Sequence, residues 1–201
     1  MADSPSILAP VAITCSTRDC QNDKHYFRHT VKTSADGKVP TCPGCETKVT
    51  DLIDWDRTRR QNIDDIKYVC DAMSKEFIRH HFWHVEIDEV ALAHARRKGR
   101  VGLRIAAEQR LRKVVGPPVD QLAREGRQTP KQGNVIFYAQ AAMATCCRAC
   151  IDKWHNVPRD RELTEEEVHH FTELVMYYIE KRLPFLTESG EVVPYRRGKG
   201  S

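Results

Sequence analysis

The sequence predicts a mainly α-helical protein with a small zinc-ribbon β module, in which zinc also stabilises the helical bundle. Two observations support this fold class: cysteines fall in closely spaced groups, and apolar residues recur at steps of three and four after residue 62. A chain of 201 residues forms one small domain or two. We divide it into a zinc-ribbon module at 1–56 and a helical domain at 57–201 that contains a basic segment at 96–113.

Four cysteines define the predicted N-terminal module. Zinc favours four soft ligands in a tetrahedron, and two cysteine pairs supply them while replacing a core that so short a segment cannot build. The β-prone run 29–33 and turn signals at 36–37 and 43–44 are typical of a ribbon. Four thiolates leave no open position, so we expect a structural zinc. The predicted ligands, spaced C-x4-C-x21-C-x2-C, are Cys15, Cys20, Cys42 and Cys45.

Helical periodicity dominates the rest of the chain. Glycines at 99 and 102 separate two helices, and an Ala-rich apolar segment indicates a buried one. The last helix begins with a capping box, because Thr164 precedes Glu167 by three residues. A hairpin turn is expected at 188–191 and a basic tail at 195–199. The predicted helices span 62–79, 88–97, 103–115, 135–145 and 164–183.

A second group of cysteines predicts another metal site. Cys147, Cys150 and His155 follow a C-x2-C-x4-H pattern, which supplies three zinc ligands. The alternative is a set of reduced cysteines packed in a helical core, where a free cysteine behaves as a small apolar residue. The fourth ligand stays open among Cys146, Cys70, His80, His84 and His94.

Two weaker patterns point to metal chemistry. His80 and His84 are four residues apart, a spacing that can chelate a metal on one helix face, although the glutamate of H-E-x-x-H is missing. His84-x-Glu86 with a later C-x2-C imitates the zinc deaminases, but Cys146 stands where they carry proline. A polar helix end with partly buried aromatic residues is the structural alternative.

Positive charge is concentrated in the segment 96–113. The chain carries a formal net charge of only +4, yet this segment has a single acid, Glu108. Arginines beside glycines suit contact with phosphates, so we expect a surface for nucleic acid or for an acidic protein. A solvated helix face with ion pairs four residues apart is the alternative. The predicted nucleic-acid-binding residues are Arg96, Arg97, Lys98, Arg100, Arg104, Arg110, Arg112 and Lys113.

Catalytic signatures are missing from the sequence. It contains no G-x-S-x-G, no phosphate-binding G-x-x-x-x-G-K and no dinucleotide fingerprint. We therefore predict a non-catalytic binding protein. Its N-terminus carries an acid where a signal peptide would carry bases, and no apolar run is long enough to span a membrane, so we expect a cytoplasmic location.

The block 128–158 resembles an uncharacterised bacterial family. Its signature in this chain runs Q-T-P, then A-T-C-C-R-x-C, then K-W-H. The chain departs from that family at Asn134 and Ala141, where the family carries histidine. Any role of those two histidines is therefore missing here.

The layout of N-terminal zinc-finger cysteines and this block also resembles the small large-subunit protein of type IV CRISPR effector complexes. The resemblance implies a non-catalytic subunit of a guide-RNA ribonucleoprotein. Its partners would be guide RNA near the 5′ handle, target DNA near a short flanking motif, and other effector subunits. The alternatives are a zinc-dependent enzyme acting on nucleic acid and a free-standing zinc interaction module.

Overall fold

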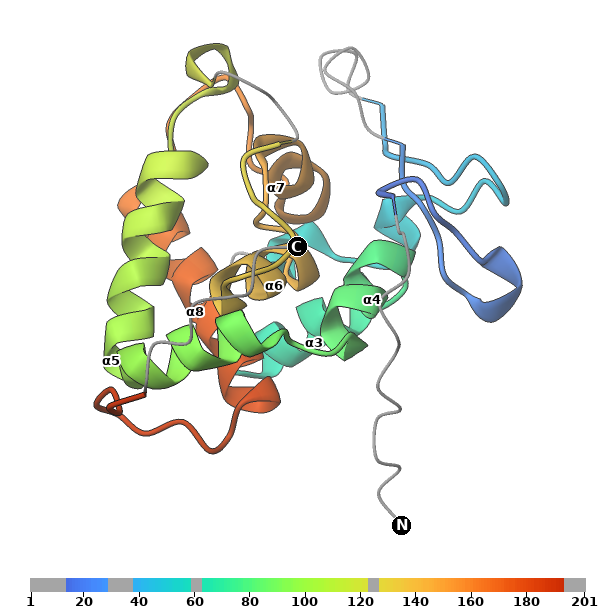
Figure 1. Ribbon diagram of the computed structural model, residues 1–201. Helices are drawn as coiled ribbons and strands as arrows, with labels where there is room; N and C mark the ends of the chain where they lie inside the picture. The colour runs from blue at the N-terminus through green and yellow to red at the C-terminus, as the bar shows by residue number, and fades with distance from the viewer. Residues whose placement is uncertain (1–13, 29–37, 59–62, 123–126, 194–201) are drawn as a thin grey trace.

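The computed structural model describes residues 14–28, 38–58, 63–122 and 127–193 (Figure 1). These parts of the chain are mainly helical, as predicted. They contain isolated β-bridges but no strand, so a zinc-ribbon β module is not seen in them. The predicted β-prone run 29–33 and the basic tail 195–199 lie outside the described residues. No described helix is both long enough and apolar enough to cross a membrane.

The helices form a bundle around α6. This short apolar helix contacts α4, α5 and α8, while α5 and α8 pack along one another (Figure 1). The helices are α2 (Trp55–Thr58), α3 (Ile63–Met73), α4 (Phe77–His84), α5 (Glu89–Val114), α6 (Val135–Ala142), α7 (Arg148–His155) and α8 (Glu165–Arg182). Short 3-10 turns occur at η1 (Cys20–Asn22), η2 (Val49–Asp51) and η3 (Val119–Gln121).

The single helix predicted over 62–79 is wrong, because the chain breaks between α3 and α4. Glu76 adopts an extended conformation there, with φ −91° and ψ 125°. Its backbone pairs with His25 in a parallel bridge, and the carbonyl of His25 accepts the N–H of Phe77 at 2.9 Å. The apolar spacing continues through the break, so only the contact with the N-terminal segment reveals it.

The break predicted within the basic segment is found at Gly99 of α5. Gly99 has φ 61° and ψ 177°, a conformation that residues with a side chain rarely adopt. A Cβ there would lie 2.5 Å from the backbone carbon of Ser189. The freed N–H groups of Arg100 and Val101 donate to the carbonyls of residues 187 and 188. The C-terminal loop therefore fills the kink (Figure 1), where the sequence predicted a hairpin.

Local signals located the start of the last helix but not the boundaries around α6 and α7. The Thr164 hydroxyl accepts the N–H of Glu167, whose carboxylate accepts the N–H of Thr164, which confirms the predicted capping box of α8. α6 ends at Ala142, earlier than predicted, and a separate helix α7 begins at Arg148. Ala144, in the turn between them, has φ 54°.

The cysteine-rich N-terminal segments pack against the bundle rather than standing apart. Phe27 is buried and meets the ring of Trp154 edge to face, with centroids 5.6 Å apart. The carbonyl of Phe27 accepts a hydrogen bond from Lys153 at 3.4 Å. This contact places the N-terminal region beside α7.

Candidate metal centres

The first centre is a cluster of three cysteines and one histidine: Cys20, His25, Cys42 and Cys45. Their ligand atoms all lie within 4.8 Å of one another. The Sγ atoms of Cys20 and Cys42 are 3.7 Å apart, and Sγ of Cys45 lies 3.2 Å from Nδ1 of His25. Hydrogen bonds from the hydroxyl and backbone of Thr47 lower the pKa of Cys45. These four side chains could hold a metal ion in a tetrahedron.

His25 is oriented by a carboxylate. Its Nε2 lies 2.9 Å from Oδ1 of Asp23, which leaves Nδ1 facing the cysteines. Asp23 also pairs with Lys75, and these two contacts lower its pKa. The backbone N–H of His25 donates to the carbonyl of Lys75 at 2.6 Å. A carboxylate behind a histidine fixes the tautomer that a metal ion requires.

Cys15 does not lie in this cluster, although the sequence predicted it as a ligand. It is exposed, and the structure places His25 where the fourth cysteine was expected. The chain between the two positions turns back at η1, where Asp19 and Lys24 form an antiparallel bridge. This reversal carries His25 to the other three ligands. Spacing between cysteines alone cannot reveal a histidine ligand.

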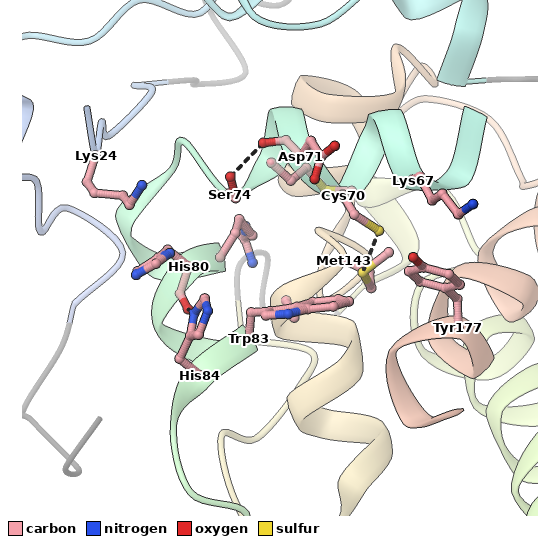
Figure 2. Close-up of a pocket in the computed structure, with 13 residues that line it drawn as sticks. Lys24, Lys67, Cys70, Asp71, Ser74, His80, Trp83, His84, Met143 and Tyr177 are labelled. Atoms are coloured by element: carbon pink, nitrogen blue, oxygen red, sulfur yellow. Dashed lines mark hydrogen bonds between the residues drawn. The ribbon is translucent and has the colours of Figure 1, made fainter. Parts of the chain in front are cut away.

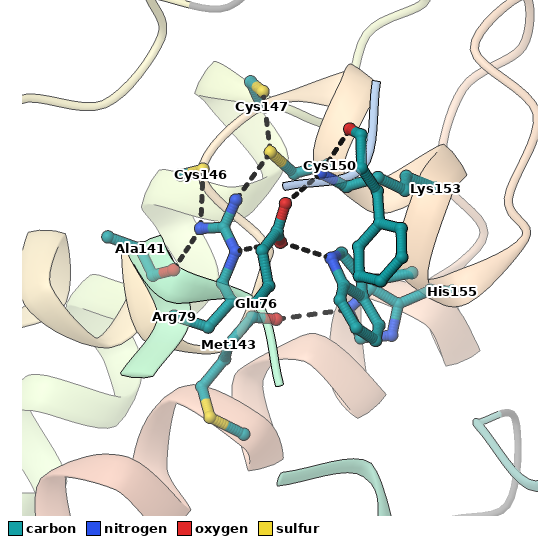
Figure 3. Close-up of polar contacts among 11 residues, drawn as sticks. Glu76, Arg79, Ala141, Met143, Cys146, Cys147, Cys150, Lys153 and His155 are labelled. Atoms are coloured by element: carbon teal, nitrogen blue, oxygen red, sulfur yellow. Dashed lines mark hydrogen bonds and ion pairs between the residues drawn. The ribbon is translucent and has the colours of Figure 1, made fainter. Parts of the chain in front are cut away.

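The second centre is formed by Cys146, Cys147 and Cys150 at the start of α7. Their sulfur atoms lie within 4.8 Å of one another, and those of Cys147 and Cys150 are 3.4 Å apart (Figure 3). Hydrogen bonds from the other two thiols hold the pKa of Cys150 well below its ordinary value, and Arg79 and Lys153 act in the same direction. Three thiols in this arrangement could hold a metal ion.

His155 is not in the second cluster, although the sequence predicted it as a ligand. Its Nε2 lies 3.1 Å from the carbonyl of Met143, and its ring packs against Phe171 with centroids 4.9 Å apart. Burial lowers its pKa to about 3. Of the candidates left open for a further ligand, Cys146 joins Cys147 and Cys150, so the described residues supply three ligands and no fourth. The others, Cys70, His80, His84 and His94, lie outside both clusters.

A fully buried guanidinium lies against the second cluster. Arg79 donates to Sγ of Cys150 at 3.1 Å and to Sγ of Cys146 at 3.7 Å, and also to the carbonyl of Ala141 (Figure 3). Burial opposes its charge, but the two thiols and Glu76, with a smaller contribution from Cys15, raise the pKa of Arg79 well above its ordinary value. Arg79 therefore remains a cation beside the sulfur atoms.

Glu76 connects this cation to α7. Its carboxylate is 1% exposed; it accepts from Nε of Arg79 at 3.0 Å and from the indole of Trp154 at 2.6 Å, and it forms an ion pair with Lys153. A buried charge is tolerated only when it is paired and hydrogen-bonded. One carboxylate here faces two cations, so the buried network has an excess of positive charge beside the thiols.

The C-C-R and K-W-H motifs thus form one structural unit. The buried Arg148 donates to the carbonyls of Val115 at 3.2 Å and Arg161 at 2.9 Å, which ties α7 to the end of α5. Lys153 and Trp154 both bind Glu76. The sequence singled out the motifs but not Glu76 or Arg79, because neither has a spacing that relates it to the cysteines.

The predicted nucleic-acid-binding residues fall into two groups. Four make internal contacts: Arg104 pairs with Glu173, Arg112 with Glu108 and Glu165, and Arg100 with Glu188, while Arg110 stacks on Phe137 and donates to Gln140. The other four are exposed: Arg96, Arg97, Lys98 and Lys113. Arg96 also lies over the ring of Phe185, at 5.3 Å.

The deaminase-like pattern does not assemble. Within the described residues, His84 belongs to neither ligand cluster, and Glu86 is exposed. Nδ1 of His84 lies 2.8 Å from the carbonyl of His80, as expected for a histidine that caps its own helix. A glutamate that moves protons for a metal-bound water would have to lie beside the metal ligands.

Fold and clusters together define a mainly helical protein with two groups of Cys and His side chains that could hold metal ions. The chain belongs to the family of the domain of unknown function DUF4186, which matches residues 41–180. That match contains all three cysteines of the second cluster and, from the first, Cys42 and Cys45. No solved structure matches this chain.

Proposed function

We propose that both clusters bind zinc and that the ion in the first cluster is structural. The observation that carries the proposal is the first cluster, in which three sulfurs and one imidazole nitrogen converge within 4.8 Å. Thiolate and imidazole ligands in a tetrahedron are typical of Zn²⁺. Four protein ligands leave no position for a reacting water, which favours a structural ion.

Charge supports a metal in the second cluster. Arg79 and Lys153 are buried with only Glu76 to balance them. A Zn²⁺ ion with three thiolates carries one net negative charge, which would neutralise the network. Uncompensated buried charge is costly, so this balance favours thiolates, the form that binds a metal ion, over three neutral thiols.

Metal counting tests the proposal. Native mass spectrometry of the full chain, purified without chelator, should show two zinc ions. His25→Ala and Cys150→Ser should each remove one, whereas Lys181→Gln, an exposed change on α8, should retain both. A chain that carries no zinc, or that keeps two ions in both ligand variants, would contradict it.

Nucleic-acid binding is the second candidate function, and the exposed basic residues of α5 favour it. Arg96 and Lys98 lie on either side of Arg97 at the kink, and Lys113 lies at the C-terminal end of the helix. Phosphate contacts by such residues release counterions, so affinity should fall steeply with salt. A plot of log affinity against log salt has a negative slope. In an Arg96→Gln, Lys98→Gln double variant this slope should become shallower by about 0.9 for each phosphate that is no longer neutralised. An unchanged slope would argue against this surface.

The more specific hypothesis, a subunit of a guide-RNA ribonucleoprotein, stays a prediction. Purification of the tagged chain from its native host, with identification of bound RNA and proteins, tests it. A short uniform RNA with a repeated protein subunit would support it. A protein that carries zinc but no RNA would leave the structural zinc proposal intact and remove the ribonucleoprotein hypothesis.

A further inference from the structure

A cavity of about 490 Å³ lies beside the second cluster and belongs to neither metal centre (Figure 2). Helices α3, α4 and α8, the end of α6 and the N-terminal segment all contribute to its wall. Small-molecule sites have volumes of roughly 300–1,000 Å³. We propose that this cavity binds a nucleoside 5′-phosphate, either as a free nucleotide or as the phosphorylated end of a nucleic-acid strand.

One end of the cavity combines a lysine with two histidines. His80 and His84 are four residues apart on α4, so their rings lie side by side with centroids 4.2 Å apart. Lys24 reaches the same end from the N-terminal segment, as Figure 2 shows. Among the described residues Lys24 forms no ion pair. A phosphate is the ligand that such a group of nitrogen donors would bind.

The other end is aromatic. Trp83 follows His80 by three residues, so it lies on the same face of α4. Its ring lies 6.3 Å from that of Tyr177 at an interplanar angle of 35°, and Met143 and Cys70 complete this end (Figure 2). Planar bases stack on such aromatic rings, with a contribution of about 1–3 kcal/mol per base.

The charge of the lining favours an anion. Lys24, Lys67 and Arg79 line the cavity with the two histidines, and Asp71 is its only acid among the described residues. Burial, together with electrostatic contributions from His84 and Lys24, lowers the pKa of His80 to about 4, so near pH 7 this ring is a neutral hydrogen-bonding group. A wall of crowded donors and cations binds a negative group more strongly than a neutral one.

The two ends together select the ligand class. Inorganic phosphate would use only the histidines and Lys24, and a neutral aromatic compound would use only Trp83 and Tyr177. A nucleotide carries its phosphate and its base on opposite sides of the ribose, as the cavity requires. A metal ion is not favoured, since no third ligand lies with the two histidines in the described residues.

Calorimetric titration of the full metal-loaded protein with AMP tests the proposal. AMP should bind, and adenosine and ribose 5-phosphate should each bind at least about tenfold more weakly, because each lacks one of the two groups. His80→Gln and Tyr177→Leu should each weaken AMP binding about tenfold, which corresponds to the loss of one charged hydrogen bond or one stacking interaction. Unchanged circular dichroism melting would confirm that both variants fold.

Lys113→Gln is the matched control, because it removes an exposed cation of α5 that does not line the cavity. It should leave AMP binding unchanged even if it weakens binding of long RNA. A 5′-phosphorylated oligonucleotide that binds more tightly than AMP would identify a strand end as the source of the ligand, and equal affinity would identify the free nucleotide. Failure of both to bind at millimolar concentration, or binding that His80→Gln and Tyr177→Leu leave unchanged, would overturn the proposal. The zinc proposal would survive that result, since it concerns other residues.

Discussion

The two cysteine clusters share their ligand chemistry but differ in what surrounds them. The first draws its ligands from Cys20, His25, Cys42 and Cys45, where Cys45 is exposed and the described residues around them form short turns and bridges. The second lies at the start of α7, against a buried ionic network. A metal ion in the first cluster would replace a hydrophobic core, whereas one in the second would form part of a core that already exists. Cysteine ligands can thus serve two different structural needs within one chain.

Removing one ligand from each cluster should produce the largest effects. Cys45→Ser should abolish metal binding at the first cluster and unfold the N-terminal segment while the helical circular dichroism signal persists. Cys150→Ser should instead destabilise the helical bundle and reduce the helical signal. Structural zinc contributes about 10–16 kcal/mol in small zinc-finger peptides, more than many domains have in total stability. Equal loss of helical signal in the two variants would show that the two clusters do not differ in their structural role.

Glu76→Gln tests the buried network without touching a cysteine. The substitution removes the carboxylate that pairs with both buried cations, Arg79 and Lys153, so the free energy of unfolding should fall by about 3–5 kcal/mol. Urea denaturation measures this loss. Glu173→Gln is the control, because its partner Arg104 is 42% exposed and such pairs contribute at most about 1 kcal/mol. Similar losses in the two variants would show that the network adds little.

Acid should destabilise the bundle before any carboxylate protonates. Burial lowers the pKa of His155 to about 3 and that of His170 to about 4, whereas both titrate near 6.5 in the unfolded chain. The unfolded state therefore binds more protons below pH 6.5, and the free energy of unfolding should decrease from there towards pH 3–4. The slope is at most about 1.4 kcal/mol per pH unit for each histidine.

Denaturation at pH 7.0 and 5.5, with metal content measured at both, checks this pH dependence. His155→Gln should flatten the slope, because glutamine can still donate to the carbonyl of Met143 but does not titrate. A variant with the slope of the native chain would assign the acid sensitivity to other groups.

The smallest effect is expected around the first cluster, at Asp23. Asp23→Ala removes the carboxylate that orients His25, and such losses weaken metal affinity about 10- to 100-fold. Competition with a chromophoric chelator measures the change. Cys15→Ser is the control, because Cys15 was predicted as a ligand but lies outside the cluster. It should leave the metal affinity of the first cluster unaltered. Weaker metal binding in Cys15→Ser would instead support Cys15 as a ligand, as the sequence predicted.

Several features were predictable because their causes are local. The break at Gly99 and the capping box of α8 depend on residues within one or two helical turns. Cys42 and Cys45 were recognised from their C-x2-C spacing, and Cys20 from its spacing to Cys15. The single helix over 62–79 was wrong because apolar spacing does not register a contact made by a distant segment.

The sequence by itself determined that the protein is mainly helical and rich in candidate metal ligands, since periodicity and cysteine spacing are properties of short segments. Only the tertiary structure decided which side chains meet. It brought His25 to the first cluster through the turn at η1, and it brought Glu76 and Arg79 to α7 through the break between α3 and α4. The physical reason is that buried charges must find partners wherever packing provides them. Arg79 and Cys150 are 71 residues apart in the chain, and Glu76 and Trp154 are 78 residues apart.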